Sequence, residues 1–339
     1  MYMATDPTVD ELRESVDAEL RSIVTSRDMP LYHMMAYHMG LSDKDGRADR
    51  PQFRERTHGI LCLLACAAAG GDPVEARPAA AAVELVENFC QIHEDVQGGL
   101  PERNNQDAVW WVWGPAQAIN AGDGMHALAR LALFRLLEGS VSKESTFRAV
   151  QLFDEASLRA CEGRFLDLEA QEHINLSVDA YLKMAAMKMG SLVSCSMMAG
   201  ALVAAADEAV YEALDTCGTS LGIAMQIKSD LRDMWGDGSE GHVPSHEVMN
   251  KKKQLPVVYA MEKASVSEKR KLGEIYFKRV LDAEDAVRLR EVIVQIGARA
   301  ECETLFKEHH ANAMTALDVP GLSTEGRAAI QQFINAILE

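Results

Sequence analysis

The sequence has little of what marks secreted, membrane-spanning or nucleic-acid-binding proteins. Its 339 residues include only 34 Lys and Arg against 51 Asp and Glu, which gives a formal net charge of −17. Because so acidic a surface repels phosphate backbones, we expect no nucleic-acid partner and no docking on an anionic membrane face. The 7 cysteines are odd in number and scattered, mostly in apolar helical stretches. This pattern favours reduced thiols and a cytoplasmic location over a disulfide framework or a zinc site.

Long apolar runs and linkers are also missing. The longest clean apolar run, residues 60–69, is about half of the roughly 20 residues that a membrane span needs, so no stable membrane insertion is expected. The opening MYMATDPTVDELRES lacks the basic start and apolar core of a secretory signal. Since no Ser/Gly-rich linker and no composition shift marks a boundary, we expect a single domain over 1–339, with residues 1–29 forming an N-terminal helix and extension.

What is present is a helical apolar period along almost the whole chain, without a convincing alternating strand. Helix starts are predicted at Asp6-Pro7, after Ser142 and at Ser323. Helices that are apolar nearly all round belong at the centre of a large bundle. Four segments fit that description: 60–69, 124–137, 185–206 and 255–261. The sequence therefore predicts an all-α fold with on the order of ten or more helices around a deep core.

Two acidic clusters follow apolar helical runs. Glu94 and Asp95 lie in HEDVQGG, whereas Asp230 and Asp233 lie three residues apart on one helix face, with Asp237 beyond them. If these helices face each other, four carboxylates meet at one end of an apolar shaft. Such an oxygen-only site suits Mg²⁺, which binds through few carboxylates plus substrate phosphates. Alternatively, each cluster is a solvated helix end.

The sequence also contains cationic residues that could bind an anionic substrate beside these acidic clusters. Lys188 lies in the nearly apolar helix AAMKMGSLVSC, where an unpaired ammonium would be costly, so it needs an anion such as a phosphate. Its stem could instead carry the charge out to the surface. Arg103 and the triplet Lys251–Lys253 are further cations, although such a triplet alone is usually solvated.

Seven segments occur in an order typical of one family. The most specific is VWWVWGPAQAINAGDGMHALARLAL (109–133), and the others are ILCLLACAAAGGDP, AAAAVELVENF, EGRFLDLEA, YLKMAAMKMGSL, GIAMQIKSDLRDMWGD and KKKQLPVVYAM. From about residue 30 to the C-terminus the chain resembles the trans-prenyl diphosphate synthases of the isoprenoid synthase superfamily. The resemblance implies an isoprenoid synthase-type helical bundle around a deep central cavity, normally a homodimer, that ionises allylic prenyl diphosphates with Mg²⁺.

The family's metal motifs are incomplete in this chain. The first aspartate-rich motif falls on Glu94, Asp95 and Gly98, so its third acid is missing. The second falls on Ser229, Asp230 and Asp233, so its first acid is a serine. The resemblance implies that these four acids and the Ser229 hydroxyl bind the metal. It also implies that the allylic diphosphate is bound by four retained residues, namely Arg103, Lys188, Gln226 and Lys252.

The family's isopentenyl diphosphate site is altered more. Its GKRxRP motif aligns with RERTHG (54–59), which puts Glu55 in place of a lysine, and Asn104 replaces the second of two arginines. Arg56 is retained, so the summed charge of these three positions, 55, 56 and 104, falls from +3 to about 0. Losing two charge-assisted hydrogen bonds of roughly 1.5–3 kcal/mol each lowers affinity on the order of a thousandfold. The alternative is that Arg50 or Arg54 substitutes.

Three further residues line up with Glu94 on one helical stripe or beside it. Glu87 and Gln91 stand where the family usually has a histidine and an apolar residue. They either point into the cavity, where they could position water or a polar acceptor, or form a network that orients Glu94. Phe89 occupies the family's chain-length position and implies a cavity for about C15–C20 substrates.

These observations favour an enzyme that ionises an allylic prenyl diphosphate of about C15–C20 without coupling it to isopentenyl diphosphate. We expect a class I terpene synthase or cyclase on the prenyltransferase fold, with transfer to a non-isoprenoid acceptor as a variant. The alternatives are a chain-elongating synthase of farnesyl or geranylgeranyl type and a catalytically silent partner subunit. No feature of the sequence favours a fourth possibility, a binding module that uses no metal.

Overall fold

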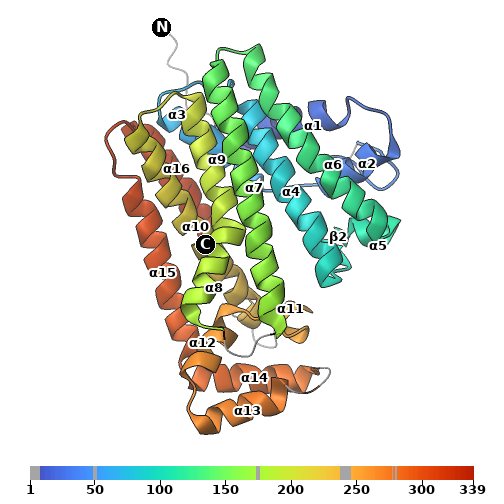
Figure 1. Cartoon of the computed structure of the whole chain (residues 1–339), viewed down its shortest axis with the longest axis vertical. Coiled ribbons are helices and arrows are strands. Elements are labelled where there is room, and N and C mark those ends of the chain that lie inside the picture. Colours follow the sequence, from blue (N-terminus) through green and yellow to red (C-terminus); the bar gives the residue numbers. More distant parts are fainter. Residues whose placement is uncertain (1–7, 49–51, 173–175, 237–245, 277, 279–280) are drawn as a thin grey trace.

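The computed structural model describes residues 8–48, 52–172, 176–236, 246–276, 278 and 281–339, and within these ranges the chain is almost entirely helical (Figure 1). The α-helices are α1 (Val9–Val24), α2 (Pro30–His38), α3 (Thr57–Ala68), α4 (Arg77–Gly98), α5 (Val109–Trp113), α6 (Pro115–Leu133), α7 (Lys143–Glu172), α8 (Val178–Ala185), α9 (Ser191–Val203), α10 (Glu208–Trp235), α11 (His246–Met249), α12 (Leu255–Lys263), α13 (Val266–Tyr276), α14 (Ala283–Gln295), α15 (Ala298–Ala316) and α16 (Thr324–Leu338). A 3₁₀ turn, η1 (Phe134–Glu138), follows α6, and a π-helical turn, η2 (Ala186–Gly190), joins α8 to α9. The all-α prediction is confirmed.

The centre of the bundle is made by the helices with the most apolar sequences. Nearly every residue of α3 and α9 is buried, and α9 packs against α3, α7 and α10. Together α8, η2 and α9 form an apolar helical stretch over Val178–Val203 that has the length and composition of a membrane span, but 67% of its most apolar window is buried inside the bundle. Its hydrophobicity is therefore accounted for by its central place in the core.

The predicted helix starts can be compared with the observed caps. Helix α1 begins after Thr8, whose side chain forms a reciprocal capping box with Glu11; the predicted Asp6-Pro7 start lies outside the described residues. Ser142 Oγ accepts from the backbone N–H of Ser145 at the start of α7. Ser323 caps α16 in the same way through Gly326. These last two predictions are confirmed.

Two glycines allow α10 to lie unusually close to its neighbours. A Cβ at Gly218 would lie 2.4 Å from the Cα of Ser194 on α9, and one at Gly222 would lie 2.5 Å from the Cα of Gly190 in η2. Neither position can carry a side chain without moving a backbone. The close contact places the C-terminal half of α10, with Asp230 and Asp233, next to the segment that carries Lys188.

Helix α4 ends in a left-handed glycine. Gly98 is the last helical residue, and Gly99 takes the left-handed conformation with φ 61°. A short antiparallel hairpin follows, with β1 (Glu102–Arg103) paired to β2 (Gln106–Asp107). Its turn residues, Asn104 and Asn105, have φ of 53° and 59°. Strands of two residues are too short to show an alternating pattern, yet this hairpin positions Arg103.

Candidate active site

The first acidic pair lies at the C-terminal end of α4, with the hairpin folded back over it. Arg103 Nε donates to Asp95 Oδ1 at 2.7 Å, and its terminal nitrogen lies 3.2 Å from Glu94 Oε2. One guanidinium therefore holds both carboxylates, and this is the geometry that Arg favours. The predicted Glu94, Asp95 and Arg103 are brought together by the structure.

The other oxygen of Glu94 faces a group of cations from three further elements. Lys188 Nζ donates to it at 3.0 Å from the π-helical turn, Lys252 Nζ lies at 3.7 Å, and Arg164 of α7 at 3.4 Å. A π-helical turn inside a helix often occurs at a functional site. Lys188 is thus buried and paired, so the possibility that it extends to the surface is wrong.

Asp167, one turn beyond Arg164, completes this network. Its Oδ2 accepts from Arg164 at 2.6 Å and from Lys188 at 3.1 Å. Burial alone would raise the pKa of Asp167, but Lys188, Lys252 and Arg164 together lower it below its usual value. Burial likewise opposes ionisation of Glu94, and the same cations hold its pKa well below the usual range. Both side chains are therefore carboxylates at neutral pH.

Asp95 behaves differently from Glu94. Burial raises the pKa of Asp95 to about 6, even though Arg103 opposes the shift. Its Oδ2 is buried and has no hydrogen-bond partner among the described residues. A buried carboxylate oxygen without a donor is costly, so this atom needs a cation or a proton.

The second acidic pair lies near the C-terminal end of α10. Asp230 accepts hydrogen bonds from the Tyr181 hydroxyl, from the Gln226 amide at 2.9 Å and from the backbone N–H of Leu255 at 2.7 Å. Burial is the largest of the effects on its pKa, which is raised. Asp233, nearer the surface, accepts from the Gln254 amide at 2.9 Å, and burial beside Asp230 raises its pKa to about 6.

Lys252 and Glu247 connect the two acidic pairs. Lys252 forms an ion pair with Glu247 at 2.6 Å and interacts with Glu94 on one side and with Asp230 and Asp233 on the other. Glu247 acts electrostatically on both Asp95 and Asp233. The predicted meeting of the two pairs at one end of the bundle is consistent with these interactions. Asp237 lies outside the described residues.

The donor set can be compared with what Mg²⁺ requires. Within the described ranges no three His, Cys, Asp or Glu side chains come close enough to hold a metal ion by themselves. The acids instead form two pairs, with the unpartnered Asp95 Oδ2 in the first. Mg²⁺ usually takes only one or two carboxylates and completes its shell with water and substrate phosphates. The residues therefore fit a metal that arrives with a diphosphate. Ser229 is half-buried on α10, and its role as a ligand stays a prediction.

An apolar cavity of about 270 Å³ extends from Glu94 and Lys188 between α4, α7 and η2. Phe89 lies in its wall, and its ring contacts two histidines, His93 with ring centroids at 4.7 Å and His126 at 5.3 Å. Beyond Phe89 a second, more open cavity of about 510 Å³ is lined by polar side chains of α6 and α7. Phe89 and Cys161 thus lie between the two cavities, and the role of Phe89 as the end of the substrate cavity stays a prediction.

A second pocket adjoins the apolar cavity and shares part of its lining. It has a volume of about 480 Å³, and Glu87, Gln91 and Met189 line both spaces. The altered residues of the predicted isopentenyl diphosphate site line it, including Glu55, Arg56 and Asn104. Arg56 is almost fully buried and is used internally, since it donates to Asp17 at 2.7 Å and to the Met39 carbonyl at 2.6 Å.

Two other arginines also line this pocket. Arg54 and Arg232 form no ion pair with any residue in the described part of the chain, and Arg54 Nε is buried without an acceptor. Burial lowers the pKa of Arg54, with Arg56 adding to the shift, but a guanidinium stays charged at neutral pH. The comparison of positions 55, 56 and 104 with the family's motif did not find Arg232. It gave Arg54 as one residue that could replace a lost cation. Arg50, the other alternative, lies outside the described residues.

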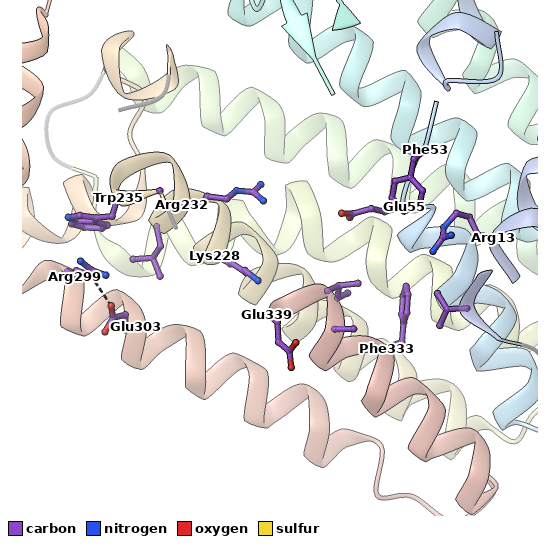
Figure 2. A pocket seen from close by; sticks show the side chains of 15 residues that line it. Arg13, Phe53, Glu55, Lys228, Arg232, Trp235, Arg299, Glu303, Phe333 and Glu339 are labelled. Carbon is purple, nitrogen blue, oxygen red and sulfur yellow. Dashed lines mark hydrogen bonds and ion pairs between the residues drawn. The ribbon is translucent and has the colours of Figure 1, made fainter. Parts of the chain in front are cut away.

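Arg232 and Glu55 also face a groove of about 680 Å³ between α10, α15 and α16 (Figure 2). Figure 2 shows Arg232 and Glu55 along one side of this groove, with Glu339 and Phe333 along the other. At one end Arg299 forms an ion pair with Glu303 at 3.0 Å and covers the ring of Trp235. The pocket with its two unpaired arginines is therefore open to solvent on this side.

Sequence reasoning missed several residues of the site. They are Arg164, Asp167, Tyr181, Glu247 and Gln254. Asp167 contacts Lys188, and the other four contact or act on the predicted acids. Arg164 and Asp167 stand in the quoted segment EGRFLDLEA, where a charged pair three apart in an otherwise helical stretch was the available signal.

Two acidic pairs, several buried cations and an adjoining apolar cavity define an enzyme of the helical isoprenoid synthase class. The sequence profile of the polyprenyl synthetase family matches residues 55–293, and the chain belongs to this family. It therefore acts on prenyl diphosphates.

Named relatives refine this placement. The chain is 33% identical over 310 residues to a geranylgeranyl diphosphate synthase of Mycobacterium tuberculosis, covering 91% of this chain and 87% of that protein. It is 32% identical over 262 residues to a (2E,6E)-farnesyl diphosphate synthase of Mycobacterium bovis, covering 77% and 72%. The crystal structure of a polyprenyl synthetase from Streptomyces coelicolor superposes with a TM-score of 0.86 at 29% identity, covering 97% of this chain and 98% of that one.

These relatives bear on the expected reaction. Both named enzymes are prenyl diphosphate synthases, so they favour the chain-elongating alternative, and a terpene synthase without isopentenyl diphosphate finds no support among them. The family and the isoprenoid synthase fold are confirmed, whereas the single-domain organisation and the individual site residues stay predictions.

Proposed function

We propose that the protein is a chain-elongating trans-prenyl diphosphate synthase that couples an allylic prenyl diphosphate to isopentenyl diphosphate. The observation that carries this proposal is the pocket beside the apolar cavity, with Arg54 and Arg232 unpaired among the described residues. Two cations and the buried Arg54 Nε without an acceptor offer charge-assisted hydrogen bonds to a second diphosphate. The charge lost at Glu55 and Asn104 is thus restored by other side chains.

The allylic diphosphate binds at the other site. Lys188, Lys252 and Arg103 surround Glu94. The phosphates of the allylic diphosphate would bind these three cations in place of the carboxylate that they contact in the free protein. Mg²⁺, held by Glu94, Asp95, Asp230 and Asp233, would supply positive charge to the departing diphosphate. The chain then extends into the apolar cavity, which excludes water and ends at Phe89. A floor there fits products of about C15–C20.

A second candidate function is ionisation without isopentenyl diphosphate, followed by cyclisation or transfer to another acceptor. It is favoured by the exposed Glu55 carboxylate in the second pocket and by the internal use of Arg56. Each of these lowers the affinity of that pocket for a diphosphate.

One assay separates the two functions. The purified protein with Mg²⁺ receives C10, C15 or C20 allylic diphosphates, each with and without isopentenyl diphosphate, and extracts are analysed before and after phosphatase treatment. Longer diphosphates that require isopentenyl diphosphate are the expected result. A hydrocarbon or alcohol formed equally well without it would overturn chain elongation and favour the second candidate.

The proposed enzyme acts as a homodimer in the cytoplasm. Large apolar side chains are exposed on α6, η1 and α7, which is unusual for a surface that faces water: Ile119, Leu131, Phe134, Leu137, Phe147, Leu158 and Phe165. A second copy that covers this face would bury them. All seven cysteines are free thiols, in keeping with a reducing compartment.

A further inference from the structure

The three successive lysines before α12 make contacts on two sides of their loop. Lys252 Nζ lies 2.6 Å from Glu247 and 3.7 Å from Glu94, in the candidate active site. Lys251 and Lys253 instead contact Tyr276, the last residue of α13. The middle lysine therefore belongs to the site, and its two neighbours connect the loop to a helix outside the site.

Helices α13 and α14 lie apart from the central bundle. Figure 1 shows them at the lower end of the molecule, beyond α12. Their buried side chains, such as Leu272 and Leu289, belong to a separate hydrophobic cluster. This cluster also includes Met234 of α10 and Val257 of α12. The two helices are thus packed against the ends of the helices on either side of the lysine loop, where they can support that loop.

Lys251 has a strained backbone that its own side chain holds in place. Its φ of 61° lies in the left-handed region, which is unfavourable for a residue with a Cβ. Its ammonium donates to the Tyr276 carbonyl at 3.0 Å and to the Lys278 carbonyl. Carbonyls at the C-terminal end of a helix have no partner within the helix, and the helix dipole attracts a cation there. These contacts stabilise the strained conformation of Lys251.

Lys253 makes the second connection to α13. Its side chain is only 8% exposed, and its ammonium lies over the Tyr276 ring, 4.6 Å from the centroid. Burial lowers the pKa of Lys253, and the charge of Lys251 adds to the shift. Since no carboxylate in the described part of the chain pairs with Lys253, the ring is the contact that offsets its burial. The loop is therefore attached to α13 on both sides of Lys252.

The same loop carries hydrogen-bond donors to the second acidic pair. The Gln254 amide donates to Asp233 at 2.9 Å, and the backbone N–H of Leu255 donates to Asp230 at 2.7 Å. Because Gln254 is only two residues beyond Lys252, a change in the loop backbone would move the Lys252 ammonium and these donors together. The conformation of the loop thus determines how the lysine and the second acidic pair are presented to a substrate.

Resting on the proposed function, we propose that Lys251 is a positioning residue for the allylic diphosphate, because it attaches the loop to the end of α13 and so fixes the place of the Lys252 ammonium. Lys252 contacts Glu94 in the free protein and would contact the phosphates in the complex. Lys251 does neither, since its ammonium is bound by carbonyls at the end of α13. Its effect on substrate binding therefore passes through the loop that carries Lys252.

The test uses the dissociation constant for farnesyl diphosphate in the presence of Mg²⁺, measured by calorimetry without isopentenyl diphosphate. We expect Lys251→Met to raise this constant about tenfold, because a displaced Lys252 loses its charge-assisted hydrogen bond to the phosphates. Lys252→Met removes the same bond and should raise the constant at least as much. In the double variant the effects should not add, so Lys251→Met should change the constant of Lys252→Met by less than about threefold.

Two further substitutions at position 251 separate the ammonium from the strain. Lys251→Arg keeps a cation that can donate to the same carbonyls, so its constant should stay within about twofold of the wild type. Lys251→Gly takes a φ of 61° without strain but lacks the cation, so it should fall between the Arg and Met variants. Lys271→Met is the matched control, because it removes the same charge from an exposed position on α13 and should leave the constant unchanged.

An unchanged dissociation constant in Lys251→Met overturns the proposal, whatever happens to Tm, because Lys251 would then only stabilise the end of α13. Fully additive effects in the double variant overturn it as well. If Lys251→Met does not fold, Lys251→Gly compared with Lys251→Arg gives the same decision. A wild type that binds farnesyl diphosphate but elongates no substrate overturns the proposed function instead, and the comparison of the variants still applies.

Discussion

Arg54→Gln tests whether a new arginine has replaced the lost cations of the second diphosphate site. Arg54 lines the pocket, and its guanidinium makes only two polar contacts in the described part of the chain: to the Phe53 carbonyl at 3.0 Å and the Gln52 amide oxygen at 3.2 Å. Its Nε is buried without an acceptor. The substitution removes one positive charge and the donors that a diphosphate would use.

The size of the effect follows from the exposure of the site. A hydrogen bond between charged groups contributes about 1.5–3 kcal/mol. Because Arg54 is partly exposed and solvent screens the charge, the lower end of this range applies. About 1.5 kcal/mol corresponds to a roughly tenfold increase in KM for isopentenyl diphosphate. The contact is present before and after bond formation, so kcat should change by less than about twofold.

Steady-state kinetics with each substrate varied in turn provides the measurement. The KM for the allylic diphosphate should stay the same, because its phosphates would bind near Lys188, which does not line this pocket. Arg47→Gln is the control, since this exposed arginine removes the same charge near the same loop without lining the pocket. Equal changes in both KM values, or a variant that behaves like Arg47→Gln, would refute the role of Arg54.

Three other predictions follow from the same structure. Lys188→Met removes the ammonium that lies 3.0 Å from Glu94 and 3.1 Å from Asp167. Because Arg164 still contacts both carboxylates, the loss should be about 2 kcal/mol, below the usual cost of breaking a buried pair, and calorimetry without substrate should show Tm lower by about 3 °C. An unchanged Tm would contradict the pairing. Phe89→Ala joins the apolar cavity to the space beyond it, so chromatography of dephosphorylated products should show chains longer than those of the wild type. An unchanged product length would place the cavity end elsewhere. Burial holds the pKa of His38 well below its usual value, helped by nearby arginines, whereas the unfolded chain takes up a proton near pH 6.5. Stability from this residue is therefore present above about pH 6.5 and is lost as pH falls, by up to about 1.4 kcal/mol per unit. The stability of the wild type relative to His38→Gln, measured by urea unfolding, should fall between pH 7.5 and 5.5, and a constant difference would count against a neutral buried ring.

Much of the fold follows from the sequence, because helices that bury all their faces must be apolar all round. The segments 60–69 and 185–206 show this directly and become α3 and the helices around α9. The apolar pattern does not predict the close backbone contact at Gly222, because in a sequence a helical glycine indicates only a weak helix former. The hairpin that presents Arg103 is likewise two residues per strand, too short for an alternating pattern.

The candidate site was predicted best where charged residues lie in apolar helices. Lys188 and Glu94 were expected at one end of the cavity, and they are 3.0 Å apart. Arg164 and Asp167 were missed because α7 carries many exposed charges, and their spacing of three residues alone is too weak a signal to separate them from the others. The comparison of the three isopentenyl-site cations looked only at matching positions, so it could not find Arg232, which lines the pocket from a different helix.

Asp230 shows why a site residue can also hold the fold. Because Asp230 is one of the acids expected to bind the metal, Asp230→Ala is the direct test of that assignment. In the structure Asp230 accepts from the Tyr181 hydroxyl, the Gln226 amide and the Leu255 backbone N–H, all of them buried. Removing the carboxylate leaves three donors without an acceptor, at about 1–3 kcal/mol for each that water cannot reach. Lost activity in Asp230→Ala would therefore mix two causes. Among the described residues Asp233 accepts one hydrogen bond, from Gln254, so Asp233→Asn tests the metal assignment with far less damage to the bundle.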